Sequence, residues 1–216
     1  MAKLFEQPRF IAIEGPIRVG KSSLAQVLAE TLHAKRIIEP EINPFLDRFY
    51  GAEPGMAFAA QMWFLMERLE QLRQVRNTEE PVVADYIFEK DKLFAYVNLS
   101  DAELALYNRY YQTFREQVPA PDLVIYLQAT PDVLKQRLKR KGLAGERAIS
   151  DAYIEQIAAA YEHFFFHYSA SDLLIVNTSD IDFVKNNKDL KLLMKRLSEP
   201  IKGTQYFLPL GENAPG

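Results

Sequence analysis

The sequence predicts an α/β fold in which helices cover both faces of a five-stranded parallel sheet. Two observations predict it: short, nearly continuous apolar runs alternate with longer amphipathic segments, and a glycine-rich loop follows the first apolar run. The strands of a parallel sheet are buried on both faces, so they read as unbroken apolar runs. Ligands of such sheets bind beyond the carboxyl ends of the strands, and we expect the functional residues there.

Five apolar runs mark the expected strands and six amphipathic segments mark the expected helices. The helical segments carry apolar side chains at three- and four-residue spacing. Ser100 and Glu103 form a capping box before one helix, and Thr130 followed by Pro131 begins another. The strands are expected at 9–14, 36–39, 81–85, 122–127 and 172–177, and the helices at 22–33, 57–76, 101–118, 131–142, 151–169 and 187–198.

The length of 216 residues suits one domain with its own core. We expect residues 1–198 to form that domain, with a short basic lid at about 137–150. Residues 199–216 contain prolines at 200, 209 and 215, and are expected to form an irregular C-terminal tail.

The composition excludes several classes of partner and chemistry. With 26 basic and 29 acidic residues the net charge is −3, which offers no positive field for a nucleic-acid polymer. The chain has no cysteine, which excludes disulfides, thiolate metal sites and a cysteine nucleophile. It has no apolar run long enough for a signal peptide or a membrane span. We therefore expect a cytoplasmic protein without a membrane partner.

A phosphate-binding loop is the strongest motif in the chain. Residues 15–22 match the pattern G-x-x-x-x-G-K-[ST] between a buried strand and an amphipathic helix. Backbone N–H groups of such a loop and the helix N-terminus bind phosphates, Lys21 reaches the β- and γ-phosphates, and Ser22 holds Mg²⁺. The motif indicates a P-loop kinase fold that uses ATP and Mg²⁺. The residues expected to bind the nucleotide are Gly15, Pro16, Ile17, Arg18, Val19, Gly20, Lys21, Ser22 and Ser23.

The features after this loop come in a characteristic order. They are Glu39-Pro40 after the second strand, Tyr50 eleven residues before Gln61, Arg68 seven residues after Gln61, and a basic segment followed by Glu146. This order resembles the deoxynucleoside kinase family, which comprises deoxycytidine, deoxyguanosine and deoxyadenosine kinases. The resemblance extends from residue 10 to about 184. It implies a homodimeric enzyme of nucleotide salvage that transfers the γ-phosphate of ATP to the 5′-hydroxyl of a deoxynucleoside.

Glu39 is the expected general base. In the family that the chain resembles, the Glu of this Glu-Pro pair takes the proton of the 5′-hydroxyl. A carboxylate at the mouth of the sheet, across from the phosphate loop, suits this task. Glu41 is a competing candidate, because some bacterial members space the motif differently.

The resemblance also implies which residues hold the deoxynucleoside. Gln61 reads the base, since an amide offers both a donor and acceptors, and Arg68 lies on the same helix face. Asp91 corresponds to an acid that helps to select the base, and with Arg68 it favours cytosine or a purine over thymine. Tyr50 and Glu146 contact the sugar 3′-hydroxyl. Candidates for apolar walls of the base site are Phe45, Phe58, Trp63 and Phe88.

The third strand departs from the family pattern. The family has Asp-Arg-Ser or Glu-Arg-Ser there, whereas this chain has Asp85-Tyr86-Ile87. Asp85 is expected to act on Mg²⁺ or its waters, although a shift of one residue would put it in the arginine's place and Ala84 in the acid's. In either register one charge is missing, and Arg18 or Lys90 is expected to replace it.

Basic residues gather where the family has its lid. Arg137, Arg140 and Lys141 come shortly before Glu146, and Arg147 follows it. The resemblance implies that these cations, Arg137 and Lys141 above all, close over the phosphates and stabilise the transferring group. The other reading is a solvated basic helix end, which favours the negative pole of the helix dipole.

Two other functions stay open at this point. Asp85-Tyr86 echoes the third strand of thymidylate kinase, but the phosphate of such an acceptor needs basic residues, and the segment 45–63 supplies only Arg48. A catalytically silent nucleotide-binding regulatory subunit is favoured only by the missing arginine. The segment 186–189 lacks the spacing of a guanine-reading motif, and His163 with His167 lacks a third ligand for a metal site.

Overall fold

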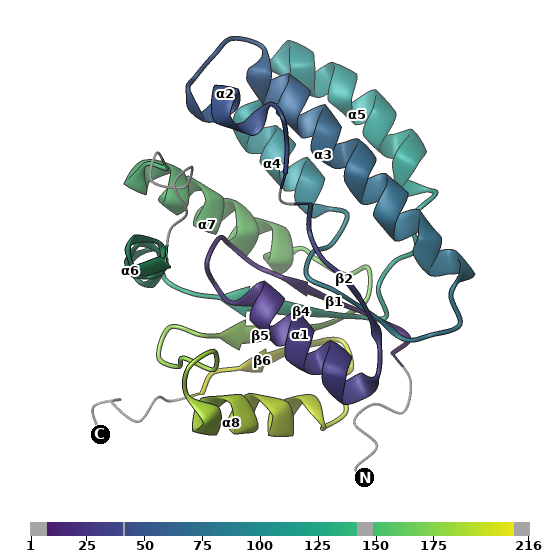
Figure 1. The fold of residues 1–216 in the computed structure, drawn as a ribbon, viewed down its shortest axis with the longest axis vertical. Helices are drawn as coiled ribbons and strands as arrows, with labels where there is room; N and C mark the ends of the chain where they lie inside the picture. Colours follow the sequence, from purple (N-terminus) through teal and green to yellow (C-terminus); the bar gives the residue numbers. More distant parts are fainter. Residues whose placement is uncertain (1–7, 41, 142–148, 210–216) are drawn as a thin grey trace.

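The computed structural model describes residues 8–40, 42–141 and 149–209, and it confirms the α/β fold with a parallel sheet. Within these residues the sheet has six strands, one more than predicted, in the order β2-β3-β1-β4-β5-β6 (Figure 1). Neighbouring strands are parallel throughout. The strands are β1 (Phe10–Glu14), β2 (Lys35–Ile37), β3 (Val82–Ala84), β4 (Leu123–Gln128), β5 (Asp172–Asn177) and β6 (Thr204–Phe207).

The sixth strand corrects the prediction of an irregular tail after residue 198. β6 pairs with β5, so that Tyr206 lies opposite Ile175. The N–H of Gly203 donates to Asp172 Oδ1 at 2.8 Å and fixes the start of the strand. As a four-residue edge strand with Tyr206 62% exposed, β6 lacks the apolar run by which the other strands were found. Pairing with β5, and not an apolar run of its own, therefore makes this segment a strand.

Helices fill the segments between the strands, largely as predicted (Figure 1). Two of them, α2 and α4, were not expected from the sequence. Within the described residues the helices are α1 (Lys21–Leu32), α2 (Leu46–Tyr50), α3 (Met56–Arg73), the 3₁₀ helix η1 (Gln74–Asn77), α4 (Lys90–Asn98), α5 (Asp101–Arg115), α6 (Pro131–Lys141), α7 (Asp151–Phe166) and α8 (Asn187–Leu197).

Helix α4 escaped the sequence prediction because charged residues occupy its buried face. Lys90 and Asp91 are both buried, together with Leu93 and Ala95. A search for apolar side chains at helical spacing scores such positions as solvent-facing. A local pattern that conflicts with the fold is characteristic of a functional site.

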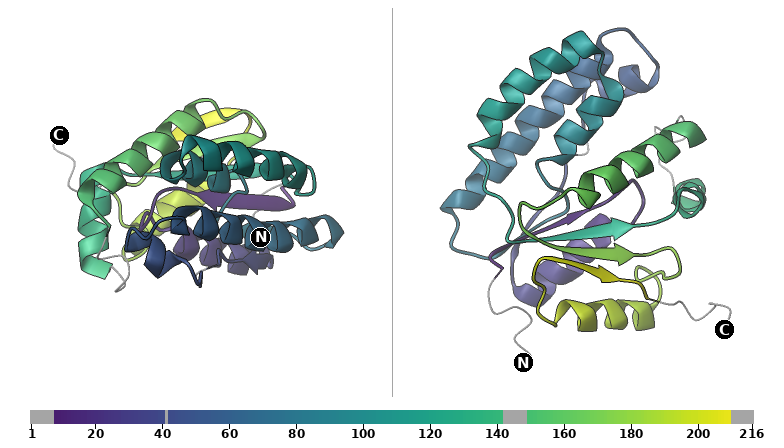
Figure 2. Two further views of the ribbon diagram at one scale, coloured as in Figure 1. Left: turned by 90° about the horizontal axis from the view of Figure 1, so that it is seen from above. Right: turned by 180° about the vertical axis from the view of Figure 1, so that it is seen from behind.

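The strands separate two apolar cores, one on each face of the sheet. In β1, Phe10 and Ala12 pack in the core formed with α3, α4, α5 and α7, whereas Ile11 and Ile13 pack in the core of α1 and α8. Figure 2 shows the sheet between these two groups of helices. Because both faces are covered, the strands are apolar throughout.

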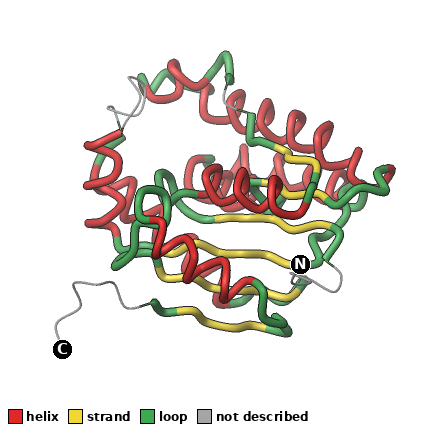
Figure 3. Tube along the Cα trace, turned by 60° about the horizontal axis from the view of Figure 1, so that its bottom comes forward, coloured by secondary structure: helices red, strands yellow, loops and turns green. Residues whose placement is uncertain are grey.

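The strands lie side by side (Figure 3), and parallel pairing brings their carboxyl ends to one edge of the sheet. The phosphate loop, residues 15–20, joins β1 to α1 at that edge. The segments after β2 and β3 begin there as well, so three connections converge on one place. In the described parts of the chain, no helix has the length and apolar character that crossing a membrane requires.

Candidate active site

A cavity of about 560 Å³ lies at the carboxyl ends of the strands, a size that suits a small-molecule ligand. It is bounded by the phosphate loop, the segment after β2, α3, α4 and α7. The sequence-predicted residues that line it are Pro16, Ile17, Arg18, Val19, Gly20, Lys21, Ser22, Ser23, Glu39, Tyr50, Gln61, Arg68, Asp85 and Arg137.

Some predicted residues do not line this cavity. Asp91 is 0% exposed and lies behind it, in contact with Gln61 and Arg68. Lys141 is the last residue of α6, and its side chain lies outside what the structure describes. The same holds for the whole of Glu41, Glu146 and Arg147.

The phosphate loop has the backbone shape that wraps an anion. Gly15 and Gly20 have φ of +151° and +111°, and Arg18 takes a left-handed φ of +60°. The Lys21 ammonium donates to two carbonyl oxygens of the loop, Gly15 O at 2.8 Å and Pro16 O at 3.1 Å. Burial, and next the positive charge of Lys90, lower the pKa of Lys21 to about 8. A bound phosphate would offset that repulsion and favour the charged form.

Replacing Gly15 with alanine is expected to displace the phosphate loop. An added Cβ would lie 2.3 Å from the carbonyl oxygen of Leu127, which is backbone of a central strand. We expect the affinity for ATP, measured by calorimetry, to fall at least about tenfold. The control is Gly55→Ala, where φ is also positive, +78°, but no atom lies within 4 Å of the added Cβ. Equal ATP affinities in the two variants would contradict this account.

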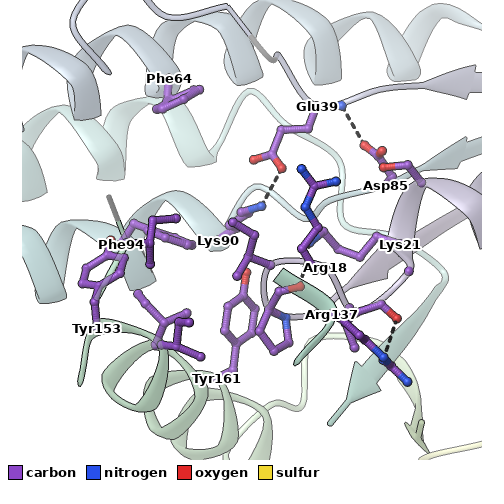
Figure 4. A pocket seen from close by; sticks show the side chains of 18 of the residues that line it. Arg18, Lys21, Glu39, Phe64, Asp85, Lys90, Phe94, Arg137, Tyr153 and Tyr161 are labelled. Atoms are coloured by element: carbon purple, nitrogen blue, oxygen red, sulfur yellow. Dashed lines mark hydrogen bonds and ion pairs between the residues drawn. The ribbon is translucent and has the colours of Figure 1, made fainter. Parts of the chain in front are cut away.

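Glu39 lines the cavity and is held by two cations, Lys90 and Arg68, of which Figure 4 shows Lys90. Its Oε2 accepts from Lys90 Nζ at 2.6 Å and its Oε1 from Arg68 Nη2 at 2.7 Å. Its backbone N–H donates to Asp85 Oδ1 at 2.6 Å, which joins the ends of β2 and β3. Burial alone would raise the pKa of Glu39, but Lys90, Arg68 and Lys21 together hold it well below its usual range.

A buried network links Glu39 to Asp91. Arg68 bridges the two carboxylates, and Asp91 Oδ1 also accepts from Gln61 Nε2 at 2.7 Å and from the Tyr107 hydroxyl at 2.7 Å. Gln61 Nε2 donates in addition to the backbone oxygen of Asp91 at 2.8 Å. Both amide hydrogens are thereby used, which fixes the orientation of the amide and leaves Oε1 as an acceptor. Arg68 Nε is buried and donates to no described residue.

Asp85 and Ala84, the two candidates for the place of the acid, lie in different surroundings at the end of β3. Asp85 lines the cavity, whereas Ala84 is the last residue of β3 and is buried in the core. Tyr86 does not replace the missing arginine, because its side chain is fully buried and its hydroxyl donates to Gln71 Oε1 at 2.6 Å. Lys90, one of the two cations expected to compensate, pairs with Glu39.

The aromatic side chains of the cavity differ from those expected. The lining includes Phe49, Phe64, Phe94, Tyr153 and Tyr161, and it does not include Phe45, Phe58, Trp63 or Phe88. On α3 the cavity face repeats at residues 57, 60, 61, 64 and 68, the helical spacing that starts from Gln61. Phe88 instead packs in the core and stacks on Tyr111 at a centroid distance of 5.3 Å. The period of α3 was therefore a usable signal for Phe64.

Glu14 is a site residue that the sequence analysis missed. It ends β1, is 0% exposed, and accepts hydrogen bonds from Gly15 N at 2.8 Å, Ile87 N at 3.0 Å and the Tyr161 hydroxyl at 3.0 Å. Burial raises its pKa. An acid that directly precedes a phosphate loop at the end of an apolar strand was the available signal. Its bonds tie the phosphate loop to the segment after β3 and to α7.

Arg137 enters the cavity from α6, but described oxygens already hold its guanidinium. It donates to Thr178 O at 2.6 Å, Thr178 Oγ1 at 3.1 Å and Ile181 O at 3.1 Å. These bonds anchor α6 to the segment after β5. Arg140 pairs with Asp182 at 3.4 Å. Arg137 is thus more than a solvated helix end, and its action on a phosphate stays a prediction.

The chain is similar to known proteins in sequence and in fold. Residues 11–202 match the family model described as deoxynucleoside kinase. The chain is 33% identical to the deoxyguanosine kinase of Bacillus subtilis (strain 168), across 89% of this chain and 97% of that one. It is 30% identical to the deoxyadenosine kinase of Lactobacillus acidophilus (strain ATCC 700396 / NCK56 / N2 / NCFM), across 89% and 96%. The structure of deoxyadenosine kinase from M. mycoides with bound dATP matches with a TM-score of 0.76 and 26% identity, across 88% and 98%.

Proposed function

The chain belongs to the deoxynucleoside kinase family, and on that premise we propose that its acceptor is the 5′-hydroxyl of a purine deoxynucleoside, deoxyguanosine first. Membership makes it an ATP-dependent phosphotransferase that acts on deoxynucleosides. The observation that carries the proposal is the cavity in which Glu39 faces the phosphate loop, with Gln61 and Arg68 beyond it. The proposed sites for ATP, for the general base and for the deoxynucleoside thereby lie in one cavity.

The choice of a purine rests on the polar groups around Gln61. Gln61 offers the acceptor Oε1, while Arg68 has a buried N–H without a described acceptor. Guanine carries N–H donors that Oε1 of Gln61 can accept, and acceptors at O6 and N7 to one of which Nε of Arg68 can donate. Two similar relatives carry the names deoxyguanosine kinase and deoxyadenosine kinase, which supports a purine.

An uncharged acceptor fits this cavity better than a monophosphate. Arg48 is the basic residue of the segment 45–63, and it pairs with Glu53 at the surface instead of lining the cavity. The segment 45–63 therefore offers the phosphate of a monophosphate no cation that lines the cavity. This supports a nucleoside kinase over a thymidylate-kinase-like enzyme.

In the proposed reaction, Glu39 accepts the proton of the 5′-hydroxyl while that oxygen attacks the γ-phosphorus of ATP. Lys21 and Arg137 stabilise the transferring phosphoryl group. Tyr50 and Glu146 hold the sugar, and Gln61, Arg68 and Asp91 hold the base. The segment 137–150 acts as the lid, with Lys141 among its cations.

Ser22 and Asp85 are the proposed Mg²⁺ ligands. Asp85 Oδ1 accepts from Glu39, and no described residue donates to Oδ2, which leaves that oxygen for a cation or its water. In the described residues no group of three His, Cys, Asp or Glu side chains could hold a metal. Mg²⁺ takes one or two carboxylates together with substrate phosphates, so Asp85 and Ser22 would suffice as protein ligands. When bound, Mg²⁺ would offset charge on the phosphates of ATP.

We also propose a cytoplasmic homodimer. Four large apolar side chains on α3, α4 and α5 are exposed, which supports a covered face: Met66 at 48%, Tyr96 at 56%, Leu106 at 42% and Tyr110 at 47%. Light scattering should give the mass of two chains at micromolar concentration. The mass of one chain would contradict the dimer.

The base preference is tested by competition. The enzyme is given ATP, Mg²⁺ and an equimolar mixture of the four natural deoxynucleosides, and the monophosphates are separated by chromatography. We expect dGMP to form first and dAMP next. Preferential formation of dTMP would contradict the purine assignment.

A further inference from the structure

Lys90 is a buried cation in an unfavourable place. It is 7% exposed and is the first residue of α4, where the helix dipole disfavours positive charge. Its ammonium lies 5.6 Å from the centre of the Phe94 ring, one turn further along the helix. The carboxylate that compensates it is Glu39, at 2.6 Å. Because this position disfavours a cation, we expect Lys90 to have a functional role and not to stabilise α4.

Glu39 does not need Lys90 to be held in place. Arg68 already binds Oε1 of Glu39, and Arg68 is itself fixed by Asp91. The backbone N–H of Glu39 is bound by Asp85. Lys90 binds the other carboxylate oxygen, Oε2, which is the oxygen that a substrate hydroxyl would have to reach. In this state, the Lys90 ammonium occupies one lone pair of Oε2 and makes Glu39 a weaker base.

Lys90 is also close to where phosphoryl transfer must occur. A hydroxyl that gives its proton to Glu39 lies about 2.6–3.2 Å from the carboxylate, and the reacting phosphorus lies about 3–3.5 Å from that hydroxyl oxygen. Lys90 Nζ lies 2.6 Å from the same carboxylate, and the positive charge of Lys90 contributes to the lowered pKa of Lys21. The flexible four-carbon stem of lysine can cover the remaining distance by rotation. Figure 4 shows Lys90 paired with Glu39, with Arg18 and Lys21 in the same cavity.

We propose that Lys90 moves from Glu39 to the transferring phosphoryl group during turnover. Lys90 then has two roles: it restrains the general base Glu39 before the reaction, and it is a catalytic cation during the reaction. This rests on the proposed function. The 5′-oxygen forms a bond to the γ-phosphorus, and the bond from that phosphorus to the bridging oxygen breaks, with its electron pair leaving on ADP. The hydroxyl proton goes to Oε2 of Glu39, the oxygen that Lys90 vacates, while Arg68 keeps Oε1. The Lys90 ammonium then faces the phosphoryl oxygens, where charge develops.

This exchange couples base activation to the arrival of phosphate. Without ATP, the Lys90 ammonium stays paired with the Glu39 carboxylate and compensates its charge. With the donor bound, the γ-phosphate competes for the same ammonium and releases Glu39 only when there is a group to transfer. The exchange also supplies the positive charge that the Asp85-Tyr86-Ile87 segment lacks.

Two variants and one control separate charge from positioning. Lys90→Gln keeps a hydrogen-bond donor for Glu39 but no charge, Lys90→Arg keeps the charge, and Lys92→Gln makes the same change on α4 outside the cavity. We expect Lys90→Gln to lower kcat about 10²–10³-fold, with the Kd of deoxyguanosine, measured by calorimetry without ATP, within about threefold of wild type. The kcat of Lys90→Arg should be at least about tenfold higher than that of Lys90→Gln, and the kcat of Lys92→Gln should match that of wild type.

A kcat of Lys90→Gln within about fivefold of wild type would overturn the proposal. So would a Lys90→Arg variant no faster than Lys90→Gln, since that outcome would give Lys90 only a positioning role. Wild-type enzyme that phosphorylates no deoxynucleoside would overturn the proposed function together with this inference. Active wild type with an unimpaired Lys90→Gln would overturn the inference alone.

A measurement on the wild-type enzyme covers the case in which a Lys90 variant does not fold. The enzyme is crystallised with ADP, Mg²⁺, aluminium fluoride and deoxyguanosine, a mimic of the transition state. Lys90 Nζ should lie about 3 Å from a fluoride ligand and no longer on Oε2 of Glu39. A Lys90 ammonium that stays on Glu39 in this complex would refute the exchange.

Discussion

Replacing Glu39 with glutamine is expected to lower kcat about 1,000-fold, because general-base catalysis contributes about 10²–10⁴-fold. Glutamine keeps the length of the side chain and one acceptor oxygen, but its amide takes no proton at neutral pH. The Kd of deoxyguanosine, measured by calorimetry, should stay within about threefold of wild type. The loss should therefore appear in kcat and not in binding.

The matched control is Glu70→Gln on α3, where the carboxylate is 58% exposed and pairs with Arg73 at the surface. This variant should have the kcat of wild type. Because Lys90 and Arg68 lose their shared anion in Glu39→Gln, both variants are assayed well below their melting temperatures. Retained turnover in Glu39→Gln would move the role of the base to Glu41 or Asp85.

Replacing Asp91 with alanine is expected to reduce the free energy of unfolding by about 3 kcal/mol, since it breaks a buried ion pair and leaves the partner uncompensated. Asp91 is 0% exposed, and its carboxylate accepts from Arg68, Gln61 and Tyr107. For a chain of this size, Tm should fall by about 6–12 °C, which thermal unfolding measures. Gln61 loses its bond to Oδ1 of Asp91 and keeps only the bond to the backbone oxygen of residue 91, so its amide is held less firmly. The rates with the four deoxynucleosides should therefore become more alike.

The control for this prediction is Asp151→Ala. Asp151 is 63% exposed and lies 3.8 Å from Lys135, a surface ion pair of the kind that contributes about 0–1 kcal/mol. Its Tm should therefore stay close to that of wild type. Equal Tm values for Asp91→Ala and Asp151→Ala would show that the buried network does not support the fold.

The parts of the fold that sequence predicts well carry their signal locally. The strands β1, β4 and β5 are apolar on both faces, and residues 15–22 need their glycines and Lys21 whatever surrounds them. Edge strand β6 could not be found in this way, because pairing with β5 creates it. Helix α4 was hidden because Lys90 and Asp91 occupy positions that apolar residues usually fill.

The site was predicted as a set of residues and not as a network. Sequence order places Glu39, Gln61 and Arg68 on neighbouring elements, but it does not reveal that Arg68 bridges Glu39 and Asp91. Sequence also left the compensating cation open between Arg18 and Lys90, because Lys90 lies five residues beyond Asp85. The start of α4 turns it back onto Glu39. Contacts across elements of this kind depend on the tertiary fold.

The most direct test of the account compares two acceptors that differ by one phosphate. The enzyme is incubated with ATP and Mg²⁺ and with either deoxyguanosine or dGMP, and the products are identified by chromatography and mass spectrometry. We predict dGMP and ADP in equal amounts from deoxyguanosine, and no dGDP from dGMP. Conversion of dGMP to dGDP, with no dGMP formed from deoxyguanosine, would indicate a monophosphate kinase. No product from either acceptor would indicate a silent nucleotide-binding subunit. Either of these results would contradict the account.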